Sequence, residues 1–232
     1  MSESNKFGGQ KLSRRTAVGL GLGTFIAAAG GLPYVLLSEG ADRAWAGPEE
    51  DLAKFMKPGA LPENAMGSED APVTVVEYSS LTCPHCANFH QQTVPSLKEK
   101  YVKTGKVRYI IREFPLDRVA LAAAAVARCA GPEKFFPLMN ALYKNQDTWA
   151  RGAGNPAERL FKMAQQAGFT KETFNACLRN KEVVDHIEAT RKRGNEEFGV
   201  SSTPTIFVNG KKVEGGNSLA DLEKAMEPYL KS

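Results

Sequence analysis

Residues of this chain follow two hydrophobic patterns, one strand-like and one helical. Runs of β-branched and aromatic residues at 73–78 and 106–114 predict two short buried strands. Between them, apolar residues recur at helical spacing from Asn88 to Tyr101 and predict a helix. A strand, a helix and a strand in this order favour parallel pairing of the strands through a right-handed crossover.

The stretch at 119–199 shows only helical patterns, so it predicts a helical segment inserted into an α/β domain. Its helical segments are 120–130, 135–143, 156–167, 173–178 and 183–197, separated by turn-forming residues. Strand signals return at 205–208 and 211–213, around Asn209-Gly210, a dipeptide preferred by type I′ hairpin turns. Ser218, with Asp221 three positions later, predicts the start of a final helix.

Residues 1–46 have the pattern of an export signal. Basic residues precede an apolar stretch rich in Gly and Ala at 17–37, and Ala44-Trp45-Ala46 offers a cleavage site. Ser13 to Val18 resembles a twin-arginine signal, although Ala17 replaces the usual bulky apolar residue. An ordinary signal, earlier cleavage after Ala27-Ala28-Ala29 and an uncleaved anchor are the alternatives, and a proline and several glycines disfavour the anchor.

Residues 47–71 predict an N-terminal arm with one short helix at 51–56, which is too short for an independent dimerisation domain. The net charge of +4 falls to +2 without residues 1–46, which hold five Lys or Arg and three Asp or Glu. A nearly neutral surface argues against a nucleic-acid partner. The basic run Arg191-Lys192-Arg193 is interpreted as a solvated helix face.

The sequence Cys83-Pro84-His85-Cys86 places a dithiol where the first strand gives way to a helix. Unpaired N–H groups and the helix dipole favour a thiolate at Cys83 in that position. A pKa lowered from about 8.5 to about 5 stabilises the reduced form by about 2.7 kcal/mol at pH 7, or about 60 mV in a two-electron couple. Pro84 holds the turn, a protonated His85 adds positive charge, and Cys86 lies one turn into the helix, less exposed.

The same two cysteines and His90 share a helical face and give three candidate metal ligands. No fourth ligand is evident nearby, and an exported chain favours disulfides, so the sequence favours a redox dithiol without a metal or bound cofactor. His90 is then interpreted as an ordinary helix residue and His186 as a surface residue.

The order of these features resembles the DsbA-like thiol:disulfide oxidoreductases of the thioredoxin superfamily. The match runs from Val73 to the C-terminus and includes Thr203-Pro204 before the hairpin. It implies an α/β thioredoxin fold over 72–118 and 200–232, with a helical insertion at 119–199. It also implies that Pro204 follows a cis peptide bond, packs against the active-site disulfide and exposes the Thr203 backbone to a substrate chain.

The resemblance also assigns roles to an acidic residue and a second cysteine pair. Glu77 corresponds to the family's buried acidic residue, and its strand parity with Val73 and Val75 supports burial over a solvent-facing position. A desolvated carboxyl has a raised pKa and can exchange protons with Cys86 near neutrality. Cys129 and Cys177, 48 positions apart, are expected to form a structural disulfide, as in many relatives, and two buried free thiols are the alternative.

The implied activity is oxidation of dithiols in reduced or unfolded exported proteins by a monomeric periplasmic enzyme, with reoxidation by a membrane quinone-linked partner. Two departures leave alternatives. Thr203 stands where the family's best-known oxidase has Val and its isomerases have Thr, and residues 79–82 and 87–89 lack that oxidase's aromatic run. The alternatives are a disulfide reductase or isomerase and, outside enzymes, a metal-handling or chaperone-like binding module.

Overall fold

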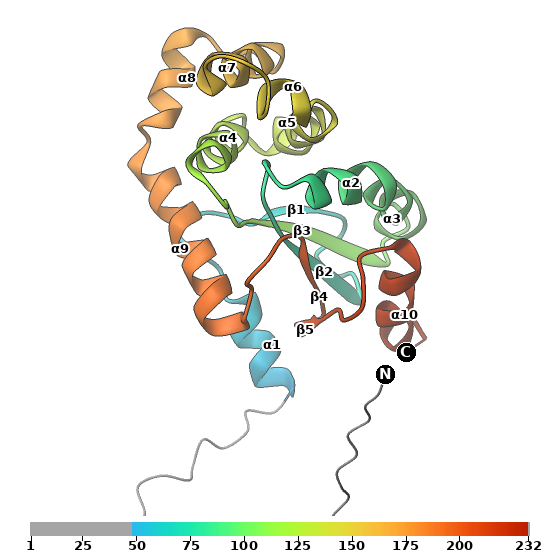
Figure 1. The fold of residues 1–232 in the computed structure, drawn as a ribbon. Helices are drawn as coiled ribbons and strands as arrows, with labels where there is room; N and C mark the ends of the chain where they lie inside the picture. The colour runs from blue at the N-terminus through green and yellow to red at the C-terminus, as the bar shows by residue number, and fades with distance from the viewer. Residues whose placement is uncertain (1–47, 232) are drawn as a thin grey trace, which may run out of the picture. The chain divides into compact units, whose positions relative to one another are not determined.

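In the computed structural model, residues 48–231 are described, and they contain a five-stranded sheet with helices on both faces (Figure 1). The predicted export signal lies outside the described residues. The strand order across the sheet is β1-β3-β2-β4-β5, with β2 and β3 parallel and the other neighbours antiparallel. The strands are β1 (Asn64–Met66), β2 (Val73–Ser79), β3 (Val107–Glu113), β4 (Thr205–Val208) and β5 (Lys211–Lys212).

Helices fill the chain between the strands, and the predicted crossover, hairpin and terminal helix are present. Asn209 and Gly210 both have positive φ, at 44° and 77°, as a type I′ turn requires. The helical elements are α1 (Pro48–Met56), α2 (Pro84–Gln92), α3 (Val94–Leu97), the π-helix η1 (Lys98–Val102), α4 (Arg118–Cys129), α5 (Pro132–Lys144), α6 (Gln146–Trp149), α7 (Pro156–Gln166), α8 (Lys171–Leu178), α9 (Lys181–Phe198) and α10 (Leu219–Leu230).

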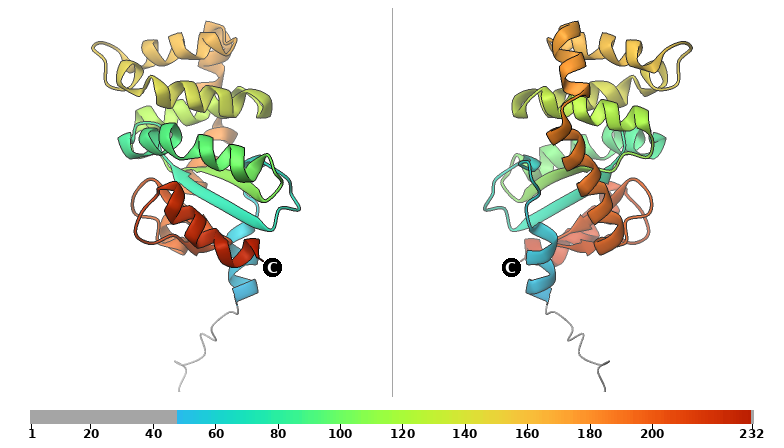
Figure 2. Two further views of the ribbon diagram at one scale, coloured as in Figure 1. Left: turned by 90° about the vertical axis from the view of Figure 1, so that its right-hand side faces the viewer. Right: turned by 90° about the vertical axis from the view of Figure 1, so that its left-hand side faces the viewer.

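Neighbouring residues of β2 and β3 point to opposite faces of the sheet, and each face has its own core. The front face, which carries Glu77 and Tyr109, packs against α2, α3 and α10. The back face, which carries Tyr78 and Arg112, packs against α1 and α9. Figure 2 shows α10, α2 and α3 toward the viewer in one view and α9 and α1 in the other.

The N-terminal arm is integrated into the domain. Phe55 of α1 is 2% exposed, and its ring centroid lies 4.7 Å from that of Phe207 and 4.8 Å from that of Phe198. The arm also supplies β1, which pairs antiparallel with β3. The sequence pattern does not predict this strand, because Asn64-Ala65-Met66 contains no β-branched or aromatic residue.

Of the helices between β3 and β4, α4 to α8 lie together beyond one end of the sheet, at the top of Figure 1, and α9 runs from them along the sheet. Cys129 at the end of α4 is bonded to Cys177 of α8, with a Cα–Cα distance of 6.1 Å, so the predicted structural disulfide is confirmed. Phe135, Leu138 and Met139 of α5 are buried in the same core. Among residues 48–231, none of the helices combines the length and apolar character needed to cross a membrane.

Candidate active site

The dithiol lies where β2 ends and α2 begins, as the sequence predicts. Cys83 is the N-cap of α2, with an extended backbone conformation at φ −78° and ψ 122°, and Pro84 occupies the first helical turn. The Cys83 carbonyl accepts the first bond of the helix, from the Ala87 N–H at 3.1 Å. Cys83 therefore lies at the positive end of the α2 dipole.

The Thr203-Pro204 peptide bond is cis and lies against the dithiol. The Cys83 sulfur lies 3.2 Å from the Thr203 carbonyl oxygen across 120 positions of sequence. Cys83 and Cys86 are both free thiols here, and they are 5% and 0% exposed. The position predicted for the Thr-Pro pair is confirmed, but Cys83 is less exposed than expected.

The two thiols have opposite acidities. A hydrogen bond from the Cys86 thiol and the backbone N–H groups of Cys86 and His85 outweigh burial and lower the pKa of Cys83 to about 5. Burial, the hydrogen bond with Cys83 and the charge of Glu77 raise the pKa of Cys86 far above its ordinary value. At neutral pH the pair therefore holds one thiolate and one thiol.

A buried polar cluster, which we call the front cluster, lies behind Cys86. Its centre is Glu77, 0% exposed, which accepts hydrogen bonds from Ser79 Oγ at 2.5 Å, from His90 Nε2 at 2.9 Å and from the Tyr109 hydroxyl. The Tyr143 hydroxyl of α5 lies 2.6 Å from Ser79 Oγ, and the Tyr143 ring stacks on the His90 ring at a centroid distance of 4.2 Å. The predicted burial of Glu77 is confirmed.

Two predictions about the front cluster are wrong. Burial raises the pKa of Glu77, but the charge of His90 and hydrogen bonds from His90, Ser79 and Tyr109 together hold it below its ordinary value. The raised pKa predicted for Glu77 followed from burial alone, and the second wrong prediction is that His90 is an ordinary helix residue. His90 is buried, and its Nε2 bonds to Glu77 instead of lying beside the thiols as a third metal ligand. No group of three or more His, Cys, Asp or Glu residues able to hold a metal occurs among the described residues.

The helical insertion also contacts the active-site turn. The side chain of Gln146, 4% exposed, donates through Nε2 to the carbonyls of Leu81 and Cys83, both at 2.9 Å. Asp117 accepts a hydrogen bond from Thr82 Oγ1 at 2.6 Å and also caps α4. Neither residue is predicted from the sequence, because these contacts join segments far apart in the chain and leave no local signal.

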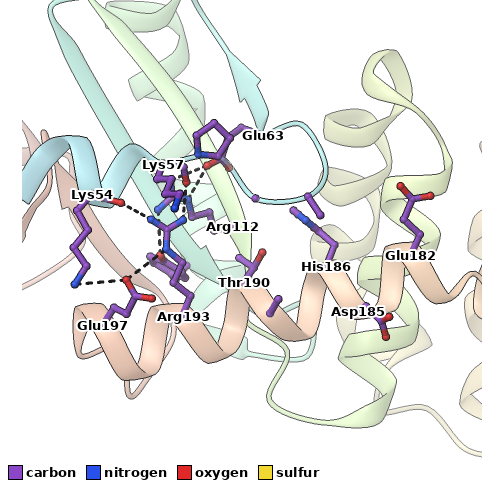
Figure 3. A pocket seen from close by; sticks show the side chains of 15 residues that line it. Lys54, Lys57, Glu63, Arg112, Glu182, Asp185, His186, Thr190, Arg193 and Glu197 are labelled. Carbon is purple, nitrogen blue, oxygen red and sulfur yellow. Dashed lines mark hydrogen bonds and ion pairs between the residues drawn. The ribbon is translucent and has the colours of Figure 1, made fainter.

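A separate cavity of about 640 Å³ lies on the back face, between the arm and α9 (Figure 3). Arg112 donates to Glu63 at 2.7 and 3.0 Å and to the Tyr78 hydroxyl at 3.2 Å. Arg193 donates to the carbonyls of Lys57 and Lys54, so this residue of the basic run is bound instead of solvated. The side chains of Arg112 and Arg193, which line the cavity, thus bind the arm to β3 and α9.

His186 also lines this cavity, and the prediction that it is a surface residue is wrong. It is 6% exposed instead of lying at the surface, and its Nδ1 accepts the N–H of Leu61 at 3.1 Å. Burial and the charge of Arg128 lower the pKa of His186 to about 4. The ring packs so closely on Gly59 that a Cβ there would lie 2.7 Å from His186 Cε1.

Comparisons with known proteins agree with this geometry. A family model described as thioredoxin matches residues 60–228. A Rickettsia typhi protein with the provisional name protein-disulfide oxidoreductase is 34% identical over 171 residues, covering 72% of this chain and 63% of the relative. A Rickettsia conorii protein of the same name is 37% identical over 168 residues, covering 70% of this chain and 60% of the relative. The chain thus spans about three fifths of the length of these relatives.

Among solved structures, the chain is similar to the crystal structure of alpha-DsbA1 from Wolbachia pipientis. The TM-score is 0.69 at 29% sequence identity, and the match covers 77% of this chain and 95% of that one. The predicted α/β thioredoxin fold with helices inserted between its halves is therefore confirmed.

Proposed function

The chain belongs to the DsbA-like group of the thioredoxin superfamily, and we propose that it is a thiol:disulfide oxidoreductase that introduces disulfides into exported proteins. The observation that carries this proposal is the asymmetry of the dithiol. The pKa of Cys83 is lowered to about 5, whereas that of Cys86 is raised. A stabilised thiolate favours the reduced form, so the Cys83–Cys86 disulfide tends to accept electrons.

In the oxidising direction, a substrate thiolate attacks the Cys83 sulfur of the Cys83–Cys86 disulfide. A mixed disulfide forms, and Cys86 leaves with the electron pair and takes up a proton. A second substrate thiolate then attacks the substrate sulfur of the mixed disulfide, and Cys83 leaves as its stabilised thiolate. The substrate gains a disulfide, the enzyme gains two electrons, and Cys86 later resolves the bond to an oxidising partner.

Thr203 supports an activity that starts from the reduced dithiol. Its backbone carbonyl contacts the Cys83 sulfur, and its residue type is the one that the resemblance associates with disulfide isomerases. A reductase or isomerase working from the reduced dithiol is therefore the alternative activity. The remaining rival is a binding module, metal-handling or chaperone-like, that uses the same dithiol without catalysing exchange.

The export signal and the family resemblance support a periplasmic location and reduced or unfolded proteins as substrates. The resemblance also supports reoxidation by a membrane quinone-linked protein. We propose that the enzyme acts as a monomer, because the arm is built into the sheet and is not a separate dimerisation domain.

The proposed activity is tested by oxidation of a reduced model protein. We expect both Cys83→Ser and Cys86→Ser to lose oxidation, because neither variant can form the Cys83–Cys86 disulfide. In Cys86→Ser the Cys83 thiolate should still attack a disulfide-bonded substrate and accumulate a mixed disulfide with it. Undiminished oxidation by Cys83→Ser would contradict the enzyme role and favour a binding module.

The direction of the activity is tested by equilibrating the dithiol with glutathione buffers. An oxidase should have a potential less negative than about −180 mV, whereas a potential near that of glutathione or below, about −240 mV, would favour the reductase or isomerase.

A further inference from the structure

The active-site turn is held by a side chain that comes from the helical insertion. Gln146 is the first residue of α6, and its buried amide nitrogen lies 2.9 Å from both the Leu81 carbonyl and the Cys83 carbonyl. This nitrogen carries two hydrogens, one for each carbonyl, whereas the reversed amide would place its oxygen against two carbonyl oxygens. Both donors of Gln146 are therefore directed at the active-site turn.

The peptide unit between Cys83 and Pro84 can be held only through its oxygen. Proline has no backbone N–H, so this unit offers an acceptor and no donor. Its carbonyl accepts the Ala87 N–H at 3.1 Å and the amide of Gln146, and these two bonds use both of its lone pairs. On the other side of Cys83, the Cys83 N–H donates to the Ser80 carbonyl at 3.1 Å. The backbone of Cys83 is thus held on both sides, and Gln146 supplies a contact from outside the turn and α2.

The position of this backbone decides where the reactive sulfur lies. Cys83 is the N-cap of α2, and the favourable field of a helix falls off within its first turn. The Cys83 sulfur also lies 3.2 Å from the Thr203 carbonyl oxygen. A rotation of the peptide unit that follows Cys83 would move the sulfur relative to both groups. A fixed turn lets the same sulfur be part of a disulfide, of a mixed disulfide or a thiolate without rearrangement of the backbone.

We propose that Gln146 is a positioning residue for thiol–disulfide exchange at Cys83. It holds the active-site turn from the helical insertion, so that the Cys83 sulfur stays at the N-terminus of α2 in each state of the reaction. This proposal deepens the proposed function and rests on it, because it concerns the same dithiol. Gln146 exchanges no proton or electron with the substrate and acts through the backbone of Cys83.

Gln146 is itself held by the packing of α6. Trp149 of this helix is 0% exposed and donates through Nε1 to the Leu142 carbonyl at 2.7 Å. Arg159 of α7 donates through Nε to the Trp149 carbonyl at 2.9 Å. A positioning side chain needs such support, because its own geometry has to be fixed before it can fix another group.

The same helix offers a matched control. Trp149→Phe removes a buried N–H that bonds to a backbone carbonyl, as the loss of the Gln146 amide does, but the Leu142 carbonyl belongs to α5 and not to the active-site turn. Both changes should lower the free energy of unfolding in urea, since each leaves a buried carbonyl without its donor. Only the change at Gln146 should alter the chemistry of Cys83.

The first test measures the acidity of Cys83 in the complete reduced chain. Gln146→Met keeps the length of the side chain and removes both donors. The rate at which iodoacetamide alkylates Cys83 follows the thiolate fraction, so its midpoint should move to a higher pH as the acid dissociation constant of the thiol falls about tenfold. Trp149→Phe should keep the wild-type midpoint.

The second test measures the equilibrium of the dithiol with glutathione at pH 7. A less favoured thiolate makes the reduced form less favoured, so the equilibrium constant for reduction of the Cys83–Cys86 disulfide should fall about tenfold in Gln146→Met. This change corresponds to a potential about 30 mV more negative. The proposal concerns this difference between variant and wild type, whereas a wild-type potential near that of glutathione would contradict the proposed oxidase.

Gln146→Glu covers the case in which Gln146→Met folds poorly. The new side chain has nearly the same shape and donates at most one hydrogen, and its ionised form disfavours a thiolate nearby. The alkylation midpoint should therefore move in the same direction. A wild-type midpoint in either folded variant, or an equal shift in Trp149→Phe, would overturn the proposal.

Discussion

The two faces of the sheet each bury a charged cluster, and neighbouring residues of the same strands build both. On the front face, Glu77 of β2 accepts hydrogen bonds from His90 and Tyr109. On the back face, Tyr78 of β2 and Arg112 of β3 meet Glu63 of the arm. The alternation of side chains along β2 therefore presents Glu77 to one cluster and Tyr78 to the other.

The two clusters differ in what lies beside them. The front cluster borders Cys86, and the charge of Glu77 helps to raise the pKa of that thiol. The back cluster borders the arm, where the Arg112 guanidinium lies 4.7 Å from the Phe55 ring and bonds to Glu63. Similar buried charge thus acts on the dithiol on one face and holds the arm on the other.

The largest effect should come from a change that touches neither face. Replacing Cys129 and Cys177 together by Ala removes a bridge that closes a 48-residue separation, and should lower the free energy of unfolding by about 4 kcal/mol. Urea unfolding measures this loss, and oxidation of a reduced model protein should keep its wild-type rate. An altered oxidation rate would mean that lost stability alone changes the reaction. A slower reaction in a variant of either face could then not be assigned to that face.

Arg112→Met breaks the back cluster. It leaves Glu63 without its buried partner and should cost about 3 kcal/mol in urea unfolding. Arg108→Met on the same strand is the control, because its partner Glu69 is largely exposed and the expected loss is below about 1 kcal/mol. A changed Cys83 pKa in Arg112→Met would show that the back face also acts on the dithiol.

Glu77→Gln breaks the front cluster while keeping its shape. Without the carboxylate, attack by Cys86 on a mixed disulfide at Cys83 should slow by about a hundredfold, the loss typical of a removed general base. An aryl disulfide that releases a coloured thiolate in this attack measures the rate. Glu113→Gln is the control, since Glu113 is a carboxylate of similar burial that bonds to Arg128 and Asn64. Equal slowing in both variants would assign the effect to lost charge in general.

The smallest effect concerns His186 of the back face. Its folded pKa of about 4 lies below its ordinary value of 6.5, so between these values the unfolded chain binds more protons than the folded chain. Stability should therefore rise with pH across that window and fall as the pH is lowered through it. In His186→Asn, whose side-chain oxygen can still accept the Leu61 N–H, the midpoint of thermal unfolding should vary less with pH there. An unchanged pH profile would contradict this assignment.

Local signals predicted much of the fold and the reacting atoms. The run before Cys83 and the proline after it define a strand, a turn and a helix within a few residues, and Asn209-Gly210 defines the hairpin. The pairing of Cys129 with Cys177 was also predicted. These features are encoded by neighbours in sequence or by a cysteine count.

The surroundings of the reacting atoms were not predictable in the same way. The sign of the Glu77 pKa depends on His90, 13 positions away on a helix whose rotation the sequence does not specify. Gln146 reaches the active-site turn across 63 positions. The burial of His186 depends on an arm that lies 125 positions earlier in the chain. Tertiary contacts of this kind decide burial and acidity, and they leave no periodic pattern.

The outer strands of the sheet have a consequence for a protein proposed to handle unfolded chains. One border is β1, with three residues, and the other is β5, with two exposed lysines. Long, flat, uncharged borders invite extended polypeptides to add on and start aggregation, and short or lysine-bearing ones resist it. The two outer strands should therefore resist the addition of extended segments from the reduced or unfolded chains that are its proposed substrates.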